Sequence, residues 1–196
     1  MKYKILIEES KENQILIKNA LSGRKSEGKR KKVVAGFLSL SMQHHHSISL
    51  LVENKLYSSA FALLRHLFDA VYRGTWISLA ASDDEIENFS IDKDFEFKNT
   101  YKLAKDIDKK INVTTFHDVY KQNSPLLHGM THGGIEQIGR QFDKDGDTIQ
   151  TTFDNEALFA LLNSSNVSLG MILLAFGDVE EDELLINLAH KIIKEE

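Results

Sequence analysis

Apolar side chains recur every three or four residues along most of the chain, which is the spacing of an amphipathic helix. The predicted helices cover about 4–21, 31–54, 57–81, 82–89 and 95–110, then a stretch from about 115, a short one after Gly134, and the stretches 155–176 and 184–193. A single proline accompanies this pattern, and there is no internal repeat. The sequence therefore predicts an all-α fold with one domain over residues 1–196, four to five core helices and short peripheral helices.

The stretch from Asp143 to Asp154 departs from the helical pattern. Its acids match positions 1, 3, 5 and 12 of an EF-hand calcium loop, but glycine stands at position 4 instead of 6 and position 12 is Asp. A turn at Asp145-Gly146, leading into residues 148–153, explains these residues better. We expect one small hairpin here and no calcium site.

Composition narrows the chemistry that the chain can perform. The absence of cysteine excludes disulfides, a thiolate nucleophile and cysteine-based metal sites. The first residues do not have the pattern of a signal peptide, and the longest apolar run, 157–176, is interrupted by polar residues 163–166. We expect a soluble cytoplasmic protein without a cofactor or a membrane partner.

The charge distribution bears on nucleic-acid binding. A net charge of −5 disfavours non-specific binding by the whole surface. The segment 22–32 is an exception, because it carries six cations against one glutamate. A solvated loop is the favoured interpretation of this segment, and contact with phosphates is the alternative.

The third predicted helix carries a row of charged residues. Arg65, Asp69 and Arg73 stand at positions i, i+4 and i+8, which predicts that the carboxylate lies between two guanidinium groups. Trp76 lies beside this row, towards the core. The row is either a salt ladder on a partly exposed face or a prepositioned anion clamp, and we treat all four residues as candidates for ligand binding.

The stretch Ser124–Gly134 concentrates residues that helices rarely need for packing. It holds the only proline, two of the eight histidines and three of the eleven glycines, so we expect a bend shaped by its surroundings. His128 and His132 have the i, i+4 spacing of a zinc pair. No glutamate lies between them and no third ligand stands at an obvious spacing, so we predict no metal site.

Acid–base chemistry is the second interpretation of this stretch. His128 or His132 would shuttle a proton, while Lys121, Ser124 or an arginine of the third helix would stabilise an anionic transition state. Cleavage of RNA next to its own 2′-hydroxyl needs no further groups. Alternatively, the glycines only allow close helix packing and the histidines bond buried carbonyl groups.

His45 stands at the centre of the apolar stripe of the second helix. Such a histidine is either buried and hydrogen-bonded for structural reasons or exposed to a pocket. In the second case His45, or its neighbour His44, forms a third wall of the site between Trp76 and His128.

Residues 64–76 and 127–134 carry a family resemblance. They resemble a group of uncharacterised bacterial helical proteins whose pattern is Arg-x-x-x-acid-x-x-x-Arg-Gly-x-Trp with a downstream Thr-His-Gly-Gly. More remotely, such proteins resemble the HEPN superfamily of compact helical bundles, which often dimerise and include RNA-cleaving toxins and antiviral effectors. HEPN ribonucleases carry an Arg that is followed, after four to six intervening residues, by a His. The nearest match in this chain is Lys121 followed by His128, with six residues between them.

The resemblance implies a HEPN-like homodimer that acts as an accessory or effector protein in stress or phage defence. Its ligand would be anionic or nucleotide-like, including RNA, and it would have a partner protein. Two alternatives stay open: a metal-independent ribonuclease that uses His128 or His132, and a non-catalytic interaction module.

Overall fold

A computed structural model describes residues 2–92, 95–132, 134–142, 145, 148–149 and 153–194. In these residues the fold is all-α, as predicted. The helices are α1 (Lys2–Leu21), α2 (Lys29–Glu53), α3 (Tyr57–Leu79), α4 (Asp83–Ile91), α5 (Thr100–Ile111), α6 (Thr115–Thr131), α7 (Ile135–Gly139), α8 (Asn155–Glu180) and α9 (Glu183–Lys194).

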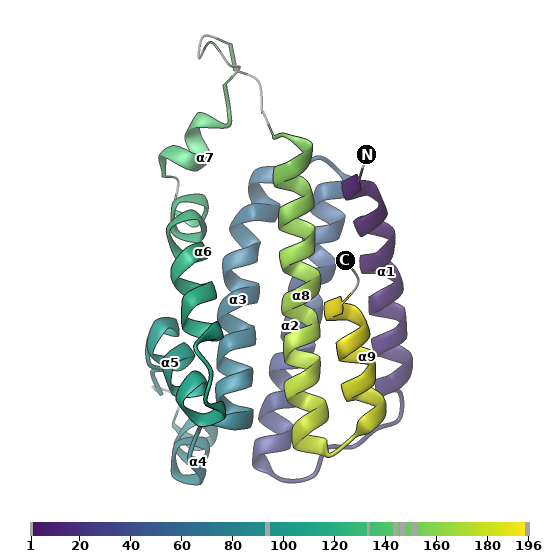
Figure 1. Ribbon diagram of the computed structural model, residues 1–196, viewed down its shortest axis with the longest axis vertical. Coiled ribbons are helices and arrows are strands. Elements are labelled where there is room, and N and C mark those ends of the chain that lie inside the picture. The colour runs from purple at the N-terminus through teal and green to yellow at the C-terminus, as the bar shows by residue number, and fades with distance from the viewer. Residues whose placement is uncertain are drawn as a thin grey trace.

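Five helices make up the core bundle. The long helix α8 packs against α1, α2, α3 and α9, and α2 packs along α3 (Figure 1). Helices α5 and α6 pack on α3 and on each other, on the side of α3 away from α1. The bundle with peripheral helices agrees with the sequence prediction, and α3 is the element shared by both layers.

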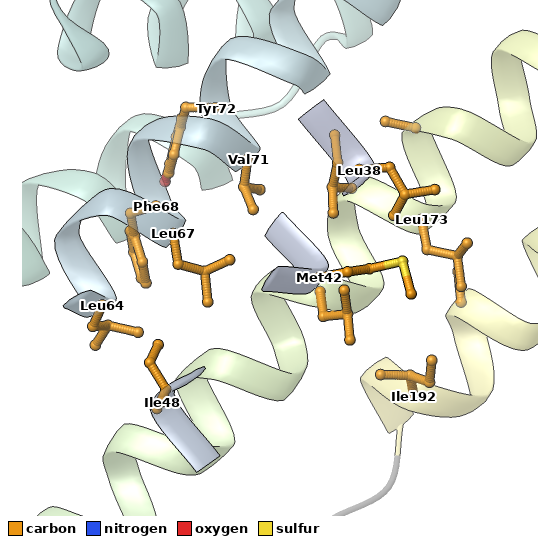
Figure 2. Packing of buried hydrophobic residues seen from close by; sticks show 14 of the residues in the cluster. Leu38, Met42, Ile48, Leu64, Leu67, Phe68, Val71, Tyr72, Leu173 and Ile192 are labelled. Carbon is orange, nitrogen blue, oxygen red and sulfur yellow. The ribbon is translucent and has the colours of Figure 1, made fainter. Parts of the chain in front are cut away.

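The core is formed where α2, α3, α8 and α9 meet. Figure 2 shows Leu38 and Ile48 of α2, Leu67 of α3, Leu173 of α8 and Ile192 of α9 pointing into one apolar interior. Each of these side chains is at most 3% exposed. Burial of one such side chain stabilises the fold by about 1.5–3 kcal/mol, so this interior fixes the position of α3.

Glycines mark where helices approach most closely. A Cβ atom on Gly74 of α3 would lie 2.7 Å from Cβ of Phe37 on α2. Gly177 was expected to end the helix that contains it, but α8 continues to Glu180 and ends at Glu181, which has a φ of 58°. A Cβ atom on Gly177 would lie 3.0 Å from the backbone nitrogen of Ile186, so this glycine lets α9 pack closely.

The largest difference between a predicted and an observed helix start is that of α5. Helix α5 begins at Thr100 rather than near Phe95, because Phe95 joins an aromatic cluster with Phe89 and Phe97. Helix α8 begins at the predicted residue, Asn155, and its N-cap is Asp154, whose carboxylate accepts a hydrogen bond from the backbone of Ala157 at 2.6 Å.

The region of the expected hairpin is only partly described. Phe142 and Ile149 form an isolated antiparallel bridge, which is consistent with a chain reversal between them. Most of the expected turn, namely 143, 144, 146 and 147, lies outside the described residues, as do 150–152. No strand longer than this bridge occurs in the described part of the chain.

Helix α8 is long and apolar enough, by length and composition alone, to cross a membrane. More than half of its apolar window, 56%, is buried inside the bundle, and the core helix of a globular bundle passes the same test. The polar residues at 163–166 do not interrupt the helix. Ser165 and Asn166 are buried within it, so the bundle interior accommodates them.

The basic segment 22–32, which includes the first turn of α2, forms ion pairs with acidic side chains of the same chain. Arg24 pairs with Asp182, and Lys31 pairs with Glu180. Lys29 and Arg30 pair with acids of α4, and Arg30 also donates to the carbonyl of Ala81 at 2.9 Å. Four of the six cations therefore connect the start of α2 to α4 and to the α8–α9 turn.

Candidate functional site

A cleft lies between α3 and the second half of α6. Its lining residues are Arg65, Tyr120, Ser124, Pro125, His128, Gly129 and Gly134, and its volume is about 530 Å³. The structure therefore brings together Arg65, Ser124 and His128, three of the predicted site residues. We call this site the Arg65 cleft.

Helix α6 carries most of the cleft and is anchored at its first turn. Its N-cap residue, Thr114, makes no side-chain capping bond. The buried carboxylate of Asp108 on α5 takes that role, accepting hydrogen bonds from the backbone nitrogens of Phe116 and His117, both at 2.9 Å. The hydroxyl of Tyr72 donates to the carbonyl of Phe116 at 2.9 Å. These bonds set the position of α6 against α3 and α5.

Helix α6 runs through Pro125 and ends at Thr131, so within the stretch Ser124–Gly134 the chain leaves the helix only after Thr131. Proline cannot donate a hydrogen bond to the carbonyl one turn earlier, that of Lys121. The helix continues because Leu127 and Met130, just after the proline, are buried against the bundle. Tertiary packing thus outweighs the low helix propensity of this stretch.

A four-residue spacing along α6 produces the wall of the cleft. Tyr120, Ser124, His128 and His132 stand at i, i+4, i+8 and i+12, so they lie in one slowly turning row. The first three line the cleft. The rings of His128 and His132 lie with centroids 4.6 Å apart. Tyr120 was not among the predicted site residues, although its spacing of four residues from Ser124 was a sufficient signal.

The position of the Arg65 guanidinium is fixed by the carboxylate of Asp69, which is itself hydrogen-bonded to Thr100. Its Nε donates to Oδ2 of Asp69 at 3.1 Å, and the hydroxyl of Thr100 donates to Oδ1 of the same carboxylate at 2.7 Å. The two terminal nitrogens of Arg65 make no hydrogen bond to the described residues. A guanidinium fixed through Nε, with both terminal nitrogens free, is suited to bidentate binding of a phosphate or carboxylate.

Arg73 does not complete a clamp around Asp69, contrary to the prediction. Over four residues the side-chain direction rotates by about 40° about the helix axis, so Arg65, Asp69 and Arg73 do not lie in a straight row. The second carboxylate oxygen of Asp69 accepts a hydrogen bond from Thr100 instead of from Arg73. The guanidinium of Arg73 instead lies 5.0 Å from the ring centre of Phe97.

Trp76 is also separate from the Arg65 cleft. It is 2% exposed, and Nζ of Lys98 lies 5.1 Å from its ring centre. Eleven residues of helix place it about 16 Å from Arg65 along α3. Lys121 is exposed on α6 and does not line the cleft.

His45 lies in the bundle interior rather than at the cleft. Nε2 of Gln14 on α1 contacts both the carbonyl of Met42, at 2.9 Å, and Nδ1 of His45, at 2.8 Å. Nε2 of His45 lies 2.7 Å from Oδ1 of Asn166 on α8, which also accepts from Ser10. The expected third wall, formed by His45, is therefore absent from the cleft, because its ring connects α1, α2 and α8.

The network around His45 determines its protonation. Because Gln14 donates to Nδ1, the proton of the neutral ring is on Nε2, where it is donated to Asn166. Burial lowers the pKa of His45 to about 4, against the hydrogen bond to Asn166, which raises it. The imidazole is thus neutral at physiological pH and structural in its contacts.

Metal binding finds no support among the described residues. They contain no group of three or more His, Asp or Glu side chains that could hold an ion. His128 and His132 are close enough to each other for acid–base chemistry, and Arg65 lies in the same cleft as His128.

Comparison with known proteins gives a family but no activity. The model of a family of unknown function (DUF6988) matches residues 38–195. This range contains every residue that lines the Arg65 cleft, whereas α1 and the start of α2 precede it. No curated protein and no solved structure matches the chain.

Proposed function

The chain belongs to this family of unknown function, and we propose that its Arg65 cleft binds a phosphate-bearing, nucleotide-like anion. The observation that carries the proposal is the pairing of a prepositioned guanidinium with a row of hydrogen-bonding side chains. Arg65 and the side chains of Ser124 and His128 line one cleft, and none of the described residues that line it carries a carboxylate. The carboxylate oxygens of Asp69, which is not among the described lining residues, accept hydrogen bonds from Arg65 and Thr100.

The size and polarity of the cleft suit such a ligand. A volume of about 530 Å³ lies in the range of sites for small molecules. The guanidinium supplies two donors for phosphate oxygens, Ser124 adds a hydroxyl, and the ring of Tyr120 offers a surface on which a base can stack. The HEPN resemblance supports a wider proposal, that the chain is a cytoplasmic accessory or effector protein in stress or phage defence.

Calorimetric titration with inorganic phosphate, AMP, ATP and a short RNA oligonucleotide tests the proposal. Arg65→Gln should weaken binding ten- to a hundredfold, because a hydrogen bond to a charged group is worth about 1.5–3 kcal/mol. Lys18→Gln is the matched control, because it removes one positive charge from α1 on the opposite side of the bundle (Figure 1). Absence of binding by all four probes, or equal binding by wild type and Arg65→Gln, refutes the proposal.

Metal-independent cleavage of RNA is the second candidate function. It is favoured by the position of His128 in the cleft and by the 4.6 Å between its ring and that of His132, which provides two groups for proton transfer. Arg65 could stabilise the anionic transition state from α3. RNA incubated with and without EDTA should be cleaved by wild type in both conditions, and His128→Ala should abolish cleavage while phosphate binding persists. Intact RNA with wild type excludes this candidate.

A further inference from the structure

A second cavity lies between α6 and α8. Both helices pack on α3, but they make hardly any contact with each other (Figure 1). The space that they leave over α3 is a pocket of about 220 Å³, whose lining residues are drawn from the ranges 68–72, 119–123 and 163–171. It shares no lining residue with the Arg65 cleft. We call it the α6–α8 pocket.

The pocket has an apolar wall that is rich in aromatic surface. Phe68, Val71 and Tyr72 of α3 line it together with Met171 of α8. The rings of Phe68 and Tyr72 lie with their centroids 6.2 Å apart. Aromatic rings pack favourably on other rings and on methionine sulfur. This wall therefore suits an aromatic ring.

Most of the polar lining comes from α8. Residues 163–166 are the polar residues that interrupt the longest apolar run of the sequence. Asn163 and Ser164 line the pocket, and so does Ser168, one turn later. Within the part of the chain that the structure describes, none of these three side chains makes a hydrogen bond, although helical serines often bond to the carbonyl one turn earlier. Their donors and acceptors are therefore available to a ligand.

Two of the polar groups are fixed in position. Ser168 is 4% exposed and lines the pocket without a hydrogen-bond partner among the described residues. A buried hydroxyl without a partner costs stability, so its place in a pocket wall points to a ligand. On α6, the side-chain nitrogen of Asn123 donates to the carbonyl of Val119 at 2.8 Å, which leaves the amide oxygen of Asn123 as an acceptor in the pocket. The pocket thus offers both a donor and an acceptor.

Charge and volume limit the ligand further. None of the described residues that line the pocket is Asp, Glu, Lys, Arg or His. An ion placed there would lose its hydration without gaining a counter-charge, so the ligand is uncharged. The 220 Å³ correspond to about seven water molecules at about 30 Å³ each. A protein cavity of about 150 Å³ is enough for benzene, so this pocket holds one ring or two small fused rings.

We propose that the α6–α8 pocket binds a small uncharged aromatic molecule whose edge both donates and accepts hydrogen bonds, such as an aromatic amide or a heterocycle. In the complex the ring packs on Phe68 and Met171, and its edge forms hydrogen bonds with Ser168 and Asn123. This inference does not depend on the anion proposed for the Arg65 cleft.

Calorimetric titration at neutral pH with nicotinamide, adenine and nicotinate tests the proposal. Nicotinamide or adenine should bind to the wild type. Nicotinate has the same ring as nicotinamide but carries a carboxylate, so nicotinamide should bind at least about tenfold more tightly. This comparison is made in Arg65→Gln, because the Arg65 cleft of the wild type could itself take up the carboxylate. The same variant should bind the uncharged probes as the wild type does, which separates this site from the Arg65 cleft.

Two variants test whether the uncharged probes bind in this pocket. Ser164→Leu fills the pocket and should abolish binding, whereas Ser39→Leu makes the same change at an exposed position of α2 and should not. Ser168→Ala removes one hydroxyl and should weaken binding about three- to tenfold, the effect of one hydrogen bond between neutral groups. Circular dichroism checks that each variant is helical, and Ser168→Ala decides the test if Ser164→Leu does not fold.

Three results overturn the proposal. The first is that neither nicotinamide nor adenine binds to the wild type at millimolar concentration. The second is that the wild type and either folded pocket variant bind the probe equally well. The third is that nicotinate binds to Arg65→Gln as tightly as nicotinamide does.

Discussion

Protonation of the buried His45 should make the stability of this protein depend on pH. Its folded pKa of about 4 lies below the ordinary value of 6.5, because burial disfavours the charged ring. Between these two values the unfolded chain binds a proton that the folded chain does not, so stability falls as the pH falls. The full contribution is present above pH 6.5.

The size of the effect follows from the two pKa values. One unit of pKa corresponds to about 1.4 kcal/mol, so the free energy of unfolding should fall by about 2 kcal/mol at pH 5 and about 3 kcal/mol at pH 4. His44 contributes in the same direction, because burial and the neighbouring His66 lower its pKa. The quantity to compare is therefore the difference between the wild type and a variant that lacks only His45.

Urea unfolding at pH 8, 6.5, 5 and 4 measures this difference. The variant His45→Gln should be less stable than wild type at pH 8, since it disturbs the bonds to Gln14 and Asn166, but it should lose less stability on acidification. His190→Gln is the control, because His190 is an exposed histidine on α9 and is not among the groups that shift the pKa of His45, so this variant should keep the loss of stability that His45 causes on acidification. Parallel curves for wild type and His45→Gln would refute the reasoning. Should His45→Gln fail to fold, a wild-type stability that is flat between pH 6.5 and 4 would refute it equally.

Two further predictions use pairs of substitutions, both measured by urea unfolding. Asp108→Ala should cost about 2–3 kcal/mol, because α6 loses its capping carboxylate and a buried hydrogen-bond network is broken, whereas Thr114→Ala should change stability by less than about 0.5 kcal/mol. Gly74→Ala should cost about 1–3 kcal/mol through overpacking against α2. Gly36→Ala, whose Cβ meets nothing within 4 Å, should be neutral or stabilise by up to about 1 kcal/mol. The reverse order within either pair contradicts the described contacts.

Prediction from the sequence succeeded where a signal was local. Helix α3 begins at the predicted residue, and Ser82 forms the capping box that its acidic neighbours indicate, with Glu85 as the reciprocal partner. These features depend on residues within one or two turns of each other. The start of α5 was misplaced because Phe95 packs against Phe89 and Phe97, a contact that helix periodicity does not contain.

In the candidate site, too, local spacing predicted some features, whereas others depended on contacts between distant residues. The i, i+4 spacing of His128 and His132 and that of Arg65 and Asp69 were visible in the sequence. The helix that carries Ser124 and His128 was not predicted, because a bend was expected there. The sequence did not show that the hydroxyl of Thr100 donates a hydrogen bond to the second carboxylate oxygen of Asp69. It also did not show that the guanidinium of Arg73 lies over the ring of Phe97 instead. The competition between two partners for one carboxylate depends on where α5 docks.

By itself, the sequence determined the helices and which of their faces are apolar, because the helix period makes burial a property of residues three and four positions apart. Only the tertiary structure decided that Arg65 meets His128, and that His45 meets Asn166 at a separation of 121 residues. The physical reason is that helix periodicity specifies a face but not its partner. The partner is selected by the free energy of packing whole helices together, to which close contacts such as that of Gly74 with Phe37 contribute.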